Sequence, residues 1–196
     1  MAKFIVITFF TLFVIFTSYF VNVSSSESHG TKSPPTWAKT EPHHGGHERK
    51  TVLQFYFHDV MTGESPTVAL IAQPIGGNNS AMSFGSLFMA DDPLTVSPDP
   101  NSYLVGRAQG LYGAASQKGV NLIMGLNYGF VDGIYNGSSV VIFGRNSVTN
   151  RVREFPVVGG TGVFRMARGY AVAETYFINH TSRNAIVGYN VTIFHL

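Results

Sequence analysis

Charged side chains that interrupt apolar segments are the residues of this sequence best suited to chemistry. Asp59 ends the segment 55–58, Asp92 lies in an Asp-Asp-Pro sequence, and Arg153 precedes another apolar segment. A carboxylic acid at the mouth of an apolar cavity has a raised pKa and can act as a general acid. An arginine beside it can donate hydrogen bonds to a phenol or carbonyl oxygen.

Each of these residues also has a structural interpretation. Asp59 could cap a turn, and Asp91-Asp92-Pro93 could end a strand. Arg107 and Arg168 could form salt bridges inside the protein. The sequence holds no Gly-x-Ser-x-Gly, His-Glu-x-x-His or Walker motif. Gly159-Gly160-Thr161-Gly162 resembles a phosphate-binding loop, but no helix is predicted after it, so a tight hairpin is the better interpretation.

Histidines cluster near the N-terminus, in the sequence His43-His44-Gly45-Gly46-His47. Imidazoles at this spacing could converge on one transition-metal ion. The sequence shows no structured surroundings for them, so we interpret them as solvated linker residues and expect no metal site and no cofactor. We expect Trp37, in the same stretch, to make only a minor packing contact.

Composition excludes several classes of function. The 196 residues include no cysteine, which excludes disulfides, cysteine-ligated zinc, iron–sulfur clusters and thiol catalysis. The net charge of +2 belongs to residues 1–50, because residues 51–196 hold eight basic and eight acidic side chains. No basic stripe is available for a nucleic acid, so we expect no such partner.

A two-residue alternation predicts an all-β protein. Large side chains at 122, 124, 126, 128 and 130 alternate with a second set that includes two glycines, which is typical of a strand. We predict eight strands, over 52–60, 67–73, 84–90, 103–113, 122–131, 138–144, 164–173 and 185–195. Long strands with scattered glycines favour an eight-stranded antiparallel β-barrel with an apolar central cavity, and a β-sandwich is the alternative.

The first 50 residues predict a secreted protein. An apolar run from Phe4 to Val23 precedes small residues, so we predict a signal peptide over 1–25, with a membrane anchor as the alternative. Residues 26–50 are rich in Ser, Pro, Gly and His and predict a flexible linker. Four sequons predict N-glycosylation, at Asn78, Asn136, Asn179 and Asn190.

Several motifs follow one another in a specific order through residues 51–196. They are Phe55-Tyr56-Phe57-His58-Asp59-Val60, Ala90-Asp91-Asp92-Pro93-Leu94-Thr95, Val105-Gly106-Arg107-Ala108-Gln109-Gly110, and the run Val152–Gly162 that continues into Phe164–Gly169. In their order and spacing the motifs resemble the dirigent protein family of plants. The resemblance covers the predicted barrel domain, 51–196.

The resemblance implies an eight-stranded barrel that forms trimers and a glycosylated protein of the apoplast and cell wall. It also implies a role in phenolic metabolism without oxidase activity. In such proteins a separate laccase or peroxidase makes phenoxy radicals from a monolignol such as coniferyl alcohol. The barrel then restricts which faces of the radicals couple, so that one lignan enantiomer forms.

Residue roles carry over by position. Asp59 matches a cavity aspartate that protonates a quinone methide, Arg153 an arginine that holds a phenolic or methide oxygen, and Tyr112 a pocket tyrosine. Asp92 matches a second acidic position that varies within the family. We also expect Phe57 and Asn146 to contact the substrate.

This sequence differs from the pinoresinol-forming members of the family in two ways, so more than one function is open. The pinoresinol-forming members carry two cysteines, absent here, and an aspartate where this chain has Asn146, which cannot donate a proton as an acid. The cysteine-free branch includes pterocarpan synthases, which dehydrate an isoflavanol. Three hypotheses follow: a guide for radical coupling, a lyase acting on an isoflavonoid, and a wall protein that organises lignin deposition without a stereochemical role.

Overall fold

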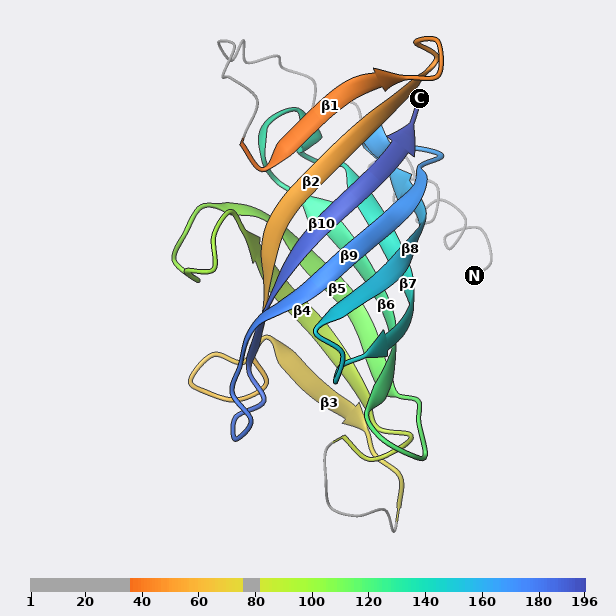
Figure 1. Cartoon of the computed structure of the whole chain (residues 1–196). Helices are drawn as coiled ribbons and strands as arrows, with labels where there is room; N and C mark the ends of the chain where they lie inside the picture. Colours follow the sequence, from red (N-terminus) through yellow and green to blue (C-terminus); the bar gives the residue numbers. More distant parts are fainter. Residues whose placement is uncertain (1–35, 76–81) are drawn as a thin grey trace, which may run out of the picture. The chain divides into compact units, whose positions relative to one another are not determined.

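The computed structural model of this chain describes residues 36–75 and 82–196 (Figure 1). The elements are β1 Ala38–His43, β2 Glu48–Asp59, β3 Val68–Ala72, β4 Leu87–Thr95, β5 Leu104–Ala114, β6 Asn121–Phe130, η1 Gly133–Tyr135, β7 Ser139–Ser147, β8 Val152–Thr161, η2 Gly162–Phe164, β9 Arg168–Ile178 and β10 Ala185–His195. No helix within the described residues is both long and apolar enough to cross a membrane. The predicted signal peptide and Asn78 lie outside these residues.

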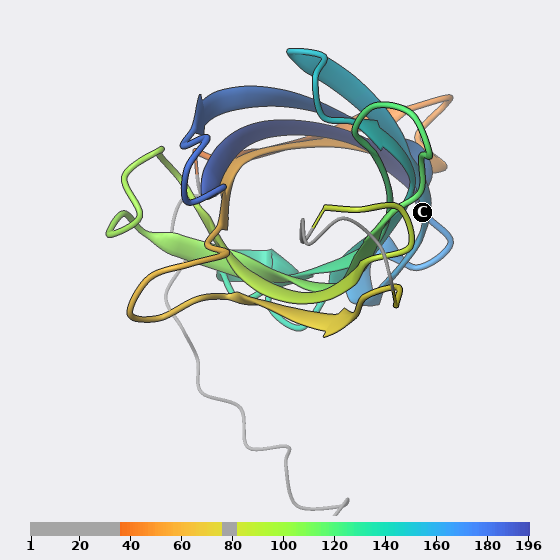
Figure 2. The ribbon, with the colours of Figure 1, turned by 90° about the horizontal axis from the view of Figure 1, so that it is seen from below.

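The strands close into an antiparallel barrel, as predicted. The sheet order is β1-β2-β10-β9-β8-β7-β6-β5-β4-β3, and a further pairing of β2 with β4 joins the two ends. That pairing places Tyr56 opposite Thr95 and Phe57 opposite Leu94. Eight strands therefore form the ring that Figure 2 shows from below, in the order β2-β10-β9-β8-β7-β6-β5-β4. The remaining two, β1 and β3, extend the sheet outside the ring.

One predicted strand lies outside the ring, and one strand of the ring was not predicted. The segment 67–73 forms β3, which pairs only with β4 and lies outside the ring, and β8, which the sequence analysis missed, takes its place. Arg153, Phe155 and Val157 of β8 are buried, whereas its alternate residues are exposed and include a glutamate and a proline. Because one buried residue is charged and the outer face is mixed, the apolar alternation of this strand was weak.

The connection after β8 also differs from the predicted hairpin. β8 continues to Thr161, and Gly162 then begins the 3₁₀ turn η2 with a φ of +60°. A Cβ atom at Gly162 would lie 2.5 Å from the Ser138 Oγ, so only glycine fits without a shift. The following strand, β9, begins at Arg168 and not at 164.

The described part of the predicted linker, residues 36–50, is folded, which corrects that prediction. β1 pairs with β2 from Ala38 opposite Leu53 to His43 opposite Glu48. Trp37 is 3% exposed, and its indole Nε1 donates a hydrogen bond to Asp132 Oδ2 at 2.8 Å. β1 is polar because it lies outside the ring and leaves much of its surface in water, so main-chain pairing and one aromatic anchor hold it without an apolar period.

The inside of the barrel is divided into two regions along its axis. We call the first the filled end; it is packed with aromatic side chains, including Phe55, Tyr128, Phe130, Tyr135 and Phe164. Phe55 and Tyr128 meet edge to face with centroids 5.4 Å apart, and Tyr135 stacks on Phe164 at the same distance. The second region, the cavity end, lies where β2, β5, β7 and β9 finish and β6, β8 and β10 begin.

Candidate functional site

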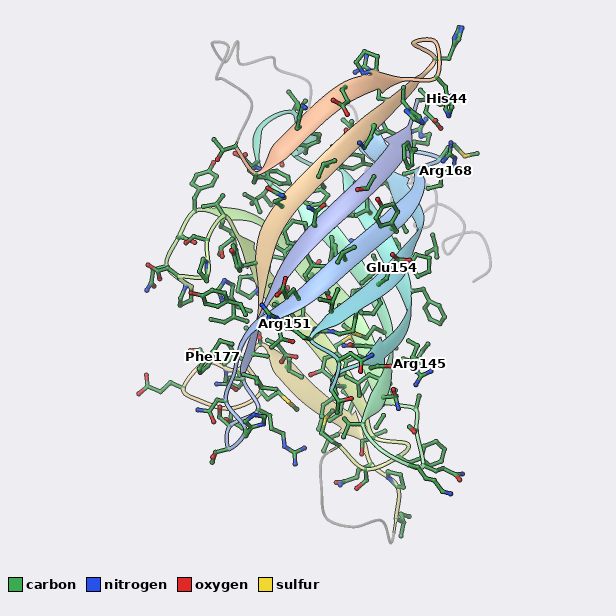
Figure 3. The ribbon with its side chains drawn as sticks, in the orientation of Figure 1. His44, Arg145, Arg151, Glu154, Arg168 and Phe177 are labelled. Atoms are coloured by element: carbon green, nitrogen blue, oxygen red, sulfur yellow. The ribbon has the colours of Figure 1, made fainter. Side chains whose placement is uncertain are left out.

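A cavity of about 740 Å³ occupies the cavity end of the barrel. Its walls are mostly apolar, and its polar side chains come from several strands and from the 179–184 loop. The lining residues include Phe57, Asp59, Tyr112, Leu122, Met124, Asn146, Arg153, Thr175, Ile178, Asn179, His180, Arg183, Val187 and Tyr189. Figure 3 labels Arg151, which is one of the lining residues, together with Arg145 and Phe177 in the same half of the barrel. A concave apolar site with few polar groups is typical of small-molecule binding.

Asp59 is the acid of this cavity. It is the last residue of β2, and the alternation that points Phe55 and Phe57 inward points it inward as well. Its Oδ2 accepts a hydrogen bond from the Tyr112 hydroxyl at 3.3 Å, whereas its buried Oδ1 has no partner within the described residues. Burial raises the pKa of Asp59 to about 7. Near neutral pH the group can therefore both donate and accept a proton.

Arg153 supplies a fixed cation. Its Nε donates to Asn146 Oδ1 at 3.2 Å, and its Nη1 donates to Thr175 Oγ1 at 2.5 Å and to the carbonyl oxygens of Asn150 and Arg151. Burial lowers the pKa of Arg153, although a guanidinium keeps its charge. All these acceptors are neutral, so the positive charge stays available for a ligand oxygen.

Asn146 is hydrogen-bonded to Arg153 and to Met124. It is 6% exposed, and its Nδ2 donates to the Met124 Sδ at 2.9 Å while its Oδ1 holds the arginine. Both partners fix the orientation of the amide. An aspartate here would form an ion pair with Arg153, so the asparagine leaves the cavity more cationic.

Asp92 lies behind the cavity wall. It is fully buried on β4, and its Oδ1 accepts a hydrogen bond from the Thr67 hydroxyl, whereas its Oδ2 has no partner within the described residues. Burial, and then the nearby charge of Asp59, raise the pKa of Asp92 to about 8. Asp92 is absent from the cavity lining, so its position suits electrostatic support of Asp59 better than direct contact with a ligand.

The other predicted site residues fall on the same cavity. Phe57, Tyr112 and Asn146 all line it. Burial and the charge of Asp59 hold the pKa of Tyr112 above its usual range, so the tyrosine is a neutral hydrogen-bond donor. The roles of these residues in binding or catalysis stay predictions.

Sequence analysis missed several lining residues. Thr175 lies beyond the predicted end of its strand at 173, whereas Val187 and Tyr189 lie in a strand that was predicted. The alternation along 185–195 was the available signal for those two. His180 and Arg183 belong to the loop between β9 and β10, for which a strand period says nothing.

Three predicted glycosylation sites lie among the described residues. Asn136, Asn179 and Asn190 are all exposed, as a glycan requires. Asn179 lies on the cavity lining, and Asn190 points outward from the middle of β10. Their occupancy stays a prediction.

The fold and the cavity place this chain among closed antiparallel β-barrels with an apolar internal cavity, and comparisons with known proteins define the family. Residues 50–194 match the family model described as Dirigent-like protein. The chain is 51% identical over 150 residues to dirigent protein 23 of Arabidopsis thaliana, covering 76% of this chain and 80% of that protein. This chain belongs to the dirigent family.

Similarity extends to proteins with a named activity. Pterocarpan synthase 1 of Glycyrrhiza echinata is 46% identical over 149 residues, covering 76% of this chain and 79% of that protein. A solved structure of a pterocarpan synthase dirigent protein superposes with a TM-score of 0.73 at 46% identity, covering 76% of this chain and 86% of that one.

Proposed function

We propose that this protein binds an uncharged phenolic molecule in its barrel and controls the stereochemistry of a ring closure that passes through a quinone methide. The observation that carries the proposal is Asp59, whose Oδ1 has no partner among the described residues and whose pKa is about 7, in an apolar cavity that also holds Arg153. Such an acid is protonated often enough near neutral pH to serve as a general acid.

In the first form of the proposal, the ligands are monolignol radicals such as those of coniferyl alcohol. A separate laccase or peroxidase removes one electron and one proton from each phenol, and two radicals then join through a new carbon–carbon bond. The product contains quinone methides. A side-chain hydroxyl adds to each methide carbon and loses its proton, while the methide oxygen gains one from Asp59, so the closure is a net isomerisation.

Arg153 and the cavity walls supply position in this mechanism. The guanidinium donates to the phenolic or methide oxygen, and Phe57 and Leu122 present apolar surface to the ring. A ligand held in one orientation exposes one face of the methide carbon, so one enantiomer forms.

A specific observation favours a second form, in which the substrate is an isoflavanol. Asp59 is the only carboxylic acid among the described residues that line the cavity. One acid suits the loss of one water: Asp59 protonates the leaving hydroxyl, and the phenol proton then returns to the Asp59 carboxylate to give the methide and water. A second hydroxyl adds to the methide carbon and closes the ring, and its proton ends on the methide oxygen. Relatives named pterocarpan synthase support this form.

One experiment separates the two forms. Purified protein is incubated with coniferyl alcohol and a one-electron oxidant, and separately with a 2′-hydroxyisoflavanol and no oxidant, and the products are resolved by chiral chromatography. An enantiomeric excess of lignan at an unchanged rate of alcohol consumption supports the first form. Loss of isoflavanol with release of one ring-closed enantiomer supports the second. Racemic lignan together with unchanged isoflavanol would contradict both and leave the role of a wall protein.

We further propose that the protein acts outside the cell as a trimer. A row of exposed apolar side chains supports self-association: Met89, Leu111 and Phe143 lie along one line across β4 to β7. Light scattering after size-exclusion chromatography measures the assembly. The Phe143→Glu variant should dissociate it, whereas a wild-type monomer would contradict the proposal.

A further inference from the structure

Two histidines and a glutamate meet at the hairpin that joins β1 to β2, at the filled end of the barrel. His43 ends β1 and lies directly opposite Glu48, the first residue of β2. His44 has a φ of +45°, and Gly45 and Gly46 follow at +67° and +85°, so the chain reverses within the turn. As a result, one ligand atom from each of His43, His44 and Glu48 lies within 4.8 Å of the other two.

The surroundings of this cluster are structured. The His43 ring packs 4.8 Å from the Phe194 ring and 4.0 Å from the His44 ring, measured between centroids. Arg168 donates from Nη2 to Glu48 Oε1 at 2.7 Å, and its guanidinium lies 5.0 Å above the Phe194 ring. Figure 3 labels His44 and Arg168 at this end of the barrel.

These contacts leave one glutamate oxygen for a ligand. Arg168 holds Oε1, so the carboxylate has a fixed orientation, and Oε2 faces His43 Nε2 at 3.9 Å. Partners that orient a ligating side chain are a regular part of metal sites. Arg168 also brings a positive charge, which balances that of Glu48 and weakens the attraction for a cation, so the two imidazoles must supply most of the affinity.

We propose that His43, His44 and Glu48 form a binding site for a divalent transition-metal ion. Two imidazoles and one carboxylate suit copper and zinc, and affinity at such donors rises from Zn²⁺ to Cu²⁺. With bonds of about 2.0–2.2 Å, two ligands of one ion lie at most about 4.4 Å apart, so a small rotation of the exposed His44 side chain completes the site. Water fills the remaining positions.

A bound ion would join the end of β1 to the start of β2. β1 lies outside the closed ring and depends on its pairing with β2, so the ion would stabilise the only pairing that β1 makes among the described strands. This site is separate from the cavity, and its function does not depend on the identity of the phenolic ligand.

The test is a metal titration of the tag-free protein. Isothermal calorimetry with Zn²⁺ and with Cu²⁺ is applied to the wild type, to His44→Ala, to Glu48→Gln and to the matched control His47→Ala. His47 lies in the same turn but outside the cluster. We expect the first two variants to bind at least about tenfold more weakly and the control to stay within about threefold of the wild type. Glu48→Gln keeps an oxygen for Arg168, so the fold should persist.

Copper supplies an independent readout. Pulsed electron paramagnetic resonance of the Cu²⁺ complex should show two imidazole nitrogen ligands in the wild type and one in His44→Ala. Wild-type affinity in both His44→Ala and Glu48→Gln would overturn the proposal. So would an equal loss in His47→Ala, which would indicate chelation by the turn histidines alone, or no saturable binding at micromolar metal.

Discussion

The filled end and the cavity end of this barrel are built from the same eight strands, yet one is solid and the other is hollow. At the filled end, Phe55 packs against Tyr128 and Phe130. The next two residues on the same face of β2 are Phe57 and Asp59, and both face the cavity instead. Both ends share the same eight strands, and strand number sets the diameter of a barrel, so the side chains decide whether the interior is packed or open.

The two ends therefore contribute differently: the filled end mainly stabilises the fold, and the cavity end holds the groups suited to chemistry. Aromatic burial at the filled end supplies cohesion, since each such ring buries a large apolar area. The cavity end carries the buried acids Asp59 and Asp92 and the guanidinium of Arg153, with no direct ion pair between them. Burying these groups lowers the stability of the fold, and the packing of the filled end offsets that loss.

The largest expected effect is on stability, at the filled end. Phe55→Ala removes a ring that is 1% exposed and should lower the free energy of unfolding by about 3–5 kcal/mol. Phe57→Ala, its neighbour on the cavity wall, should cost clearly less because it enlarges a space that already exists, and it should change the product ratio. Urea denaturation measures both. Equal losses for the two variants would contradict the division of the barrel.

The next effect is on chemistry, at the cavity end. Asp59→Asn cannot donate a proton as an acid, so selectivity or turnover should fall by about 100-fold or more while the fold persists. The matched control is Asp91→Asn, on the outer face of β4, where the carboxylate pairs with Arg107. Chiral chromatography gives the activity, and circular dichroism checks the fold. A fully active Asp59→Asn would make Asp59 structural.

A smaller loss is expected for Arg153→Lys. The lysine keeps the charge but cannot reproduce the hydrogen bonds to Asn146 and Thr175, so the cation should move and activity should fall by about tenfold. Arg153→Ala should be worse, because it removes the charge as well. If the lysine variant matched the wild type, charge alone and not its placement would matter. Product yield and enantiomeric excess measure the difference.

The smallest effect is the change in stability between pH 7 and 8. The pKa values of Asp59 and Asp92 in the folded protein, about 7 and about 8, lie above the ordinary value of 3.8. The folded state therefore holds more protons than the unfolded state, and stability falls as pH rises from about 4 to 8. Between pH 7 and 8 the fall should be on the order of 1 kcal/mol.

A variant isolates the contribution of the deeper acid. Asp92→Asn keeps an oxygen for the Thr67 hydroxyl but cannot ionise, so much of the fall between pH 7 and 8 should disappear. Thermal melts of the wild type and the variant across this pH range supply the test. An unchanged slope in the variant would show that Asp92 is not the group that titrates.

The sequence predicted residues that the structure brings together, but it predicted the wrong set of strands for the ring that holds them. Phe57, Asp59, Tyr112, Asn146 and Arg153 all line one cavity, and their roles in binding or catalysis stay predictions. The ring itself was composed differently, because β3 lies outside it and β8 lies within it. The packing of Trp37 was underestimated because its buried contacts are with Phe130 and Tyr135, which lie almost a hundred residues away in the sequence.

The sequence by itself determined the all-β class, the face of each regular strand that points inward, and the kinds of groups available for chemistry. These follow from a two-residue period and from side-chain type, which are local properties. Only the tertiary structure decided which strands close the ring, that Asp92 lies behind the wall while Asp59 lines it, and that His43 meets Glu48. Those facts depend on pairing and register between distant segments, and a local period carries no information about which strand lies beside which.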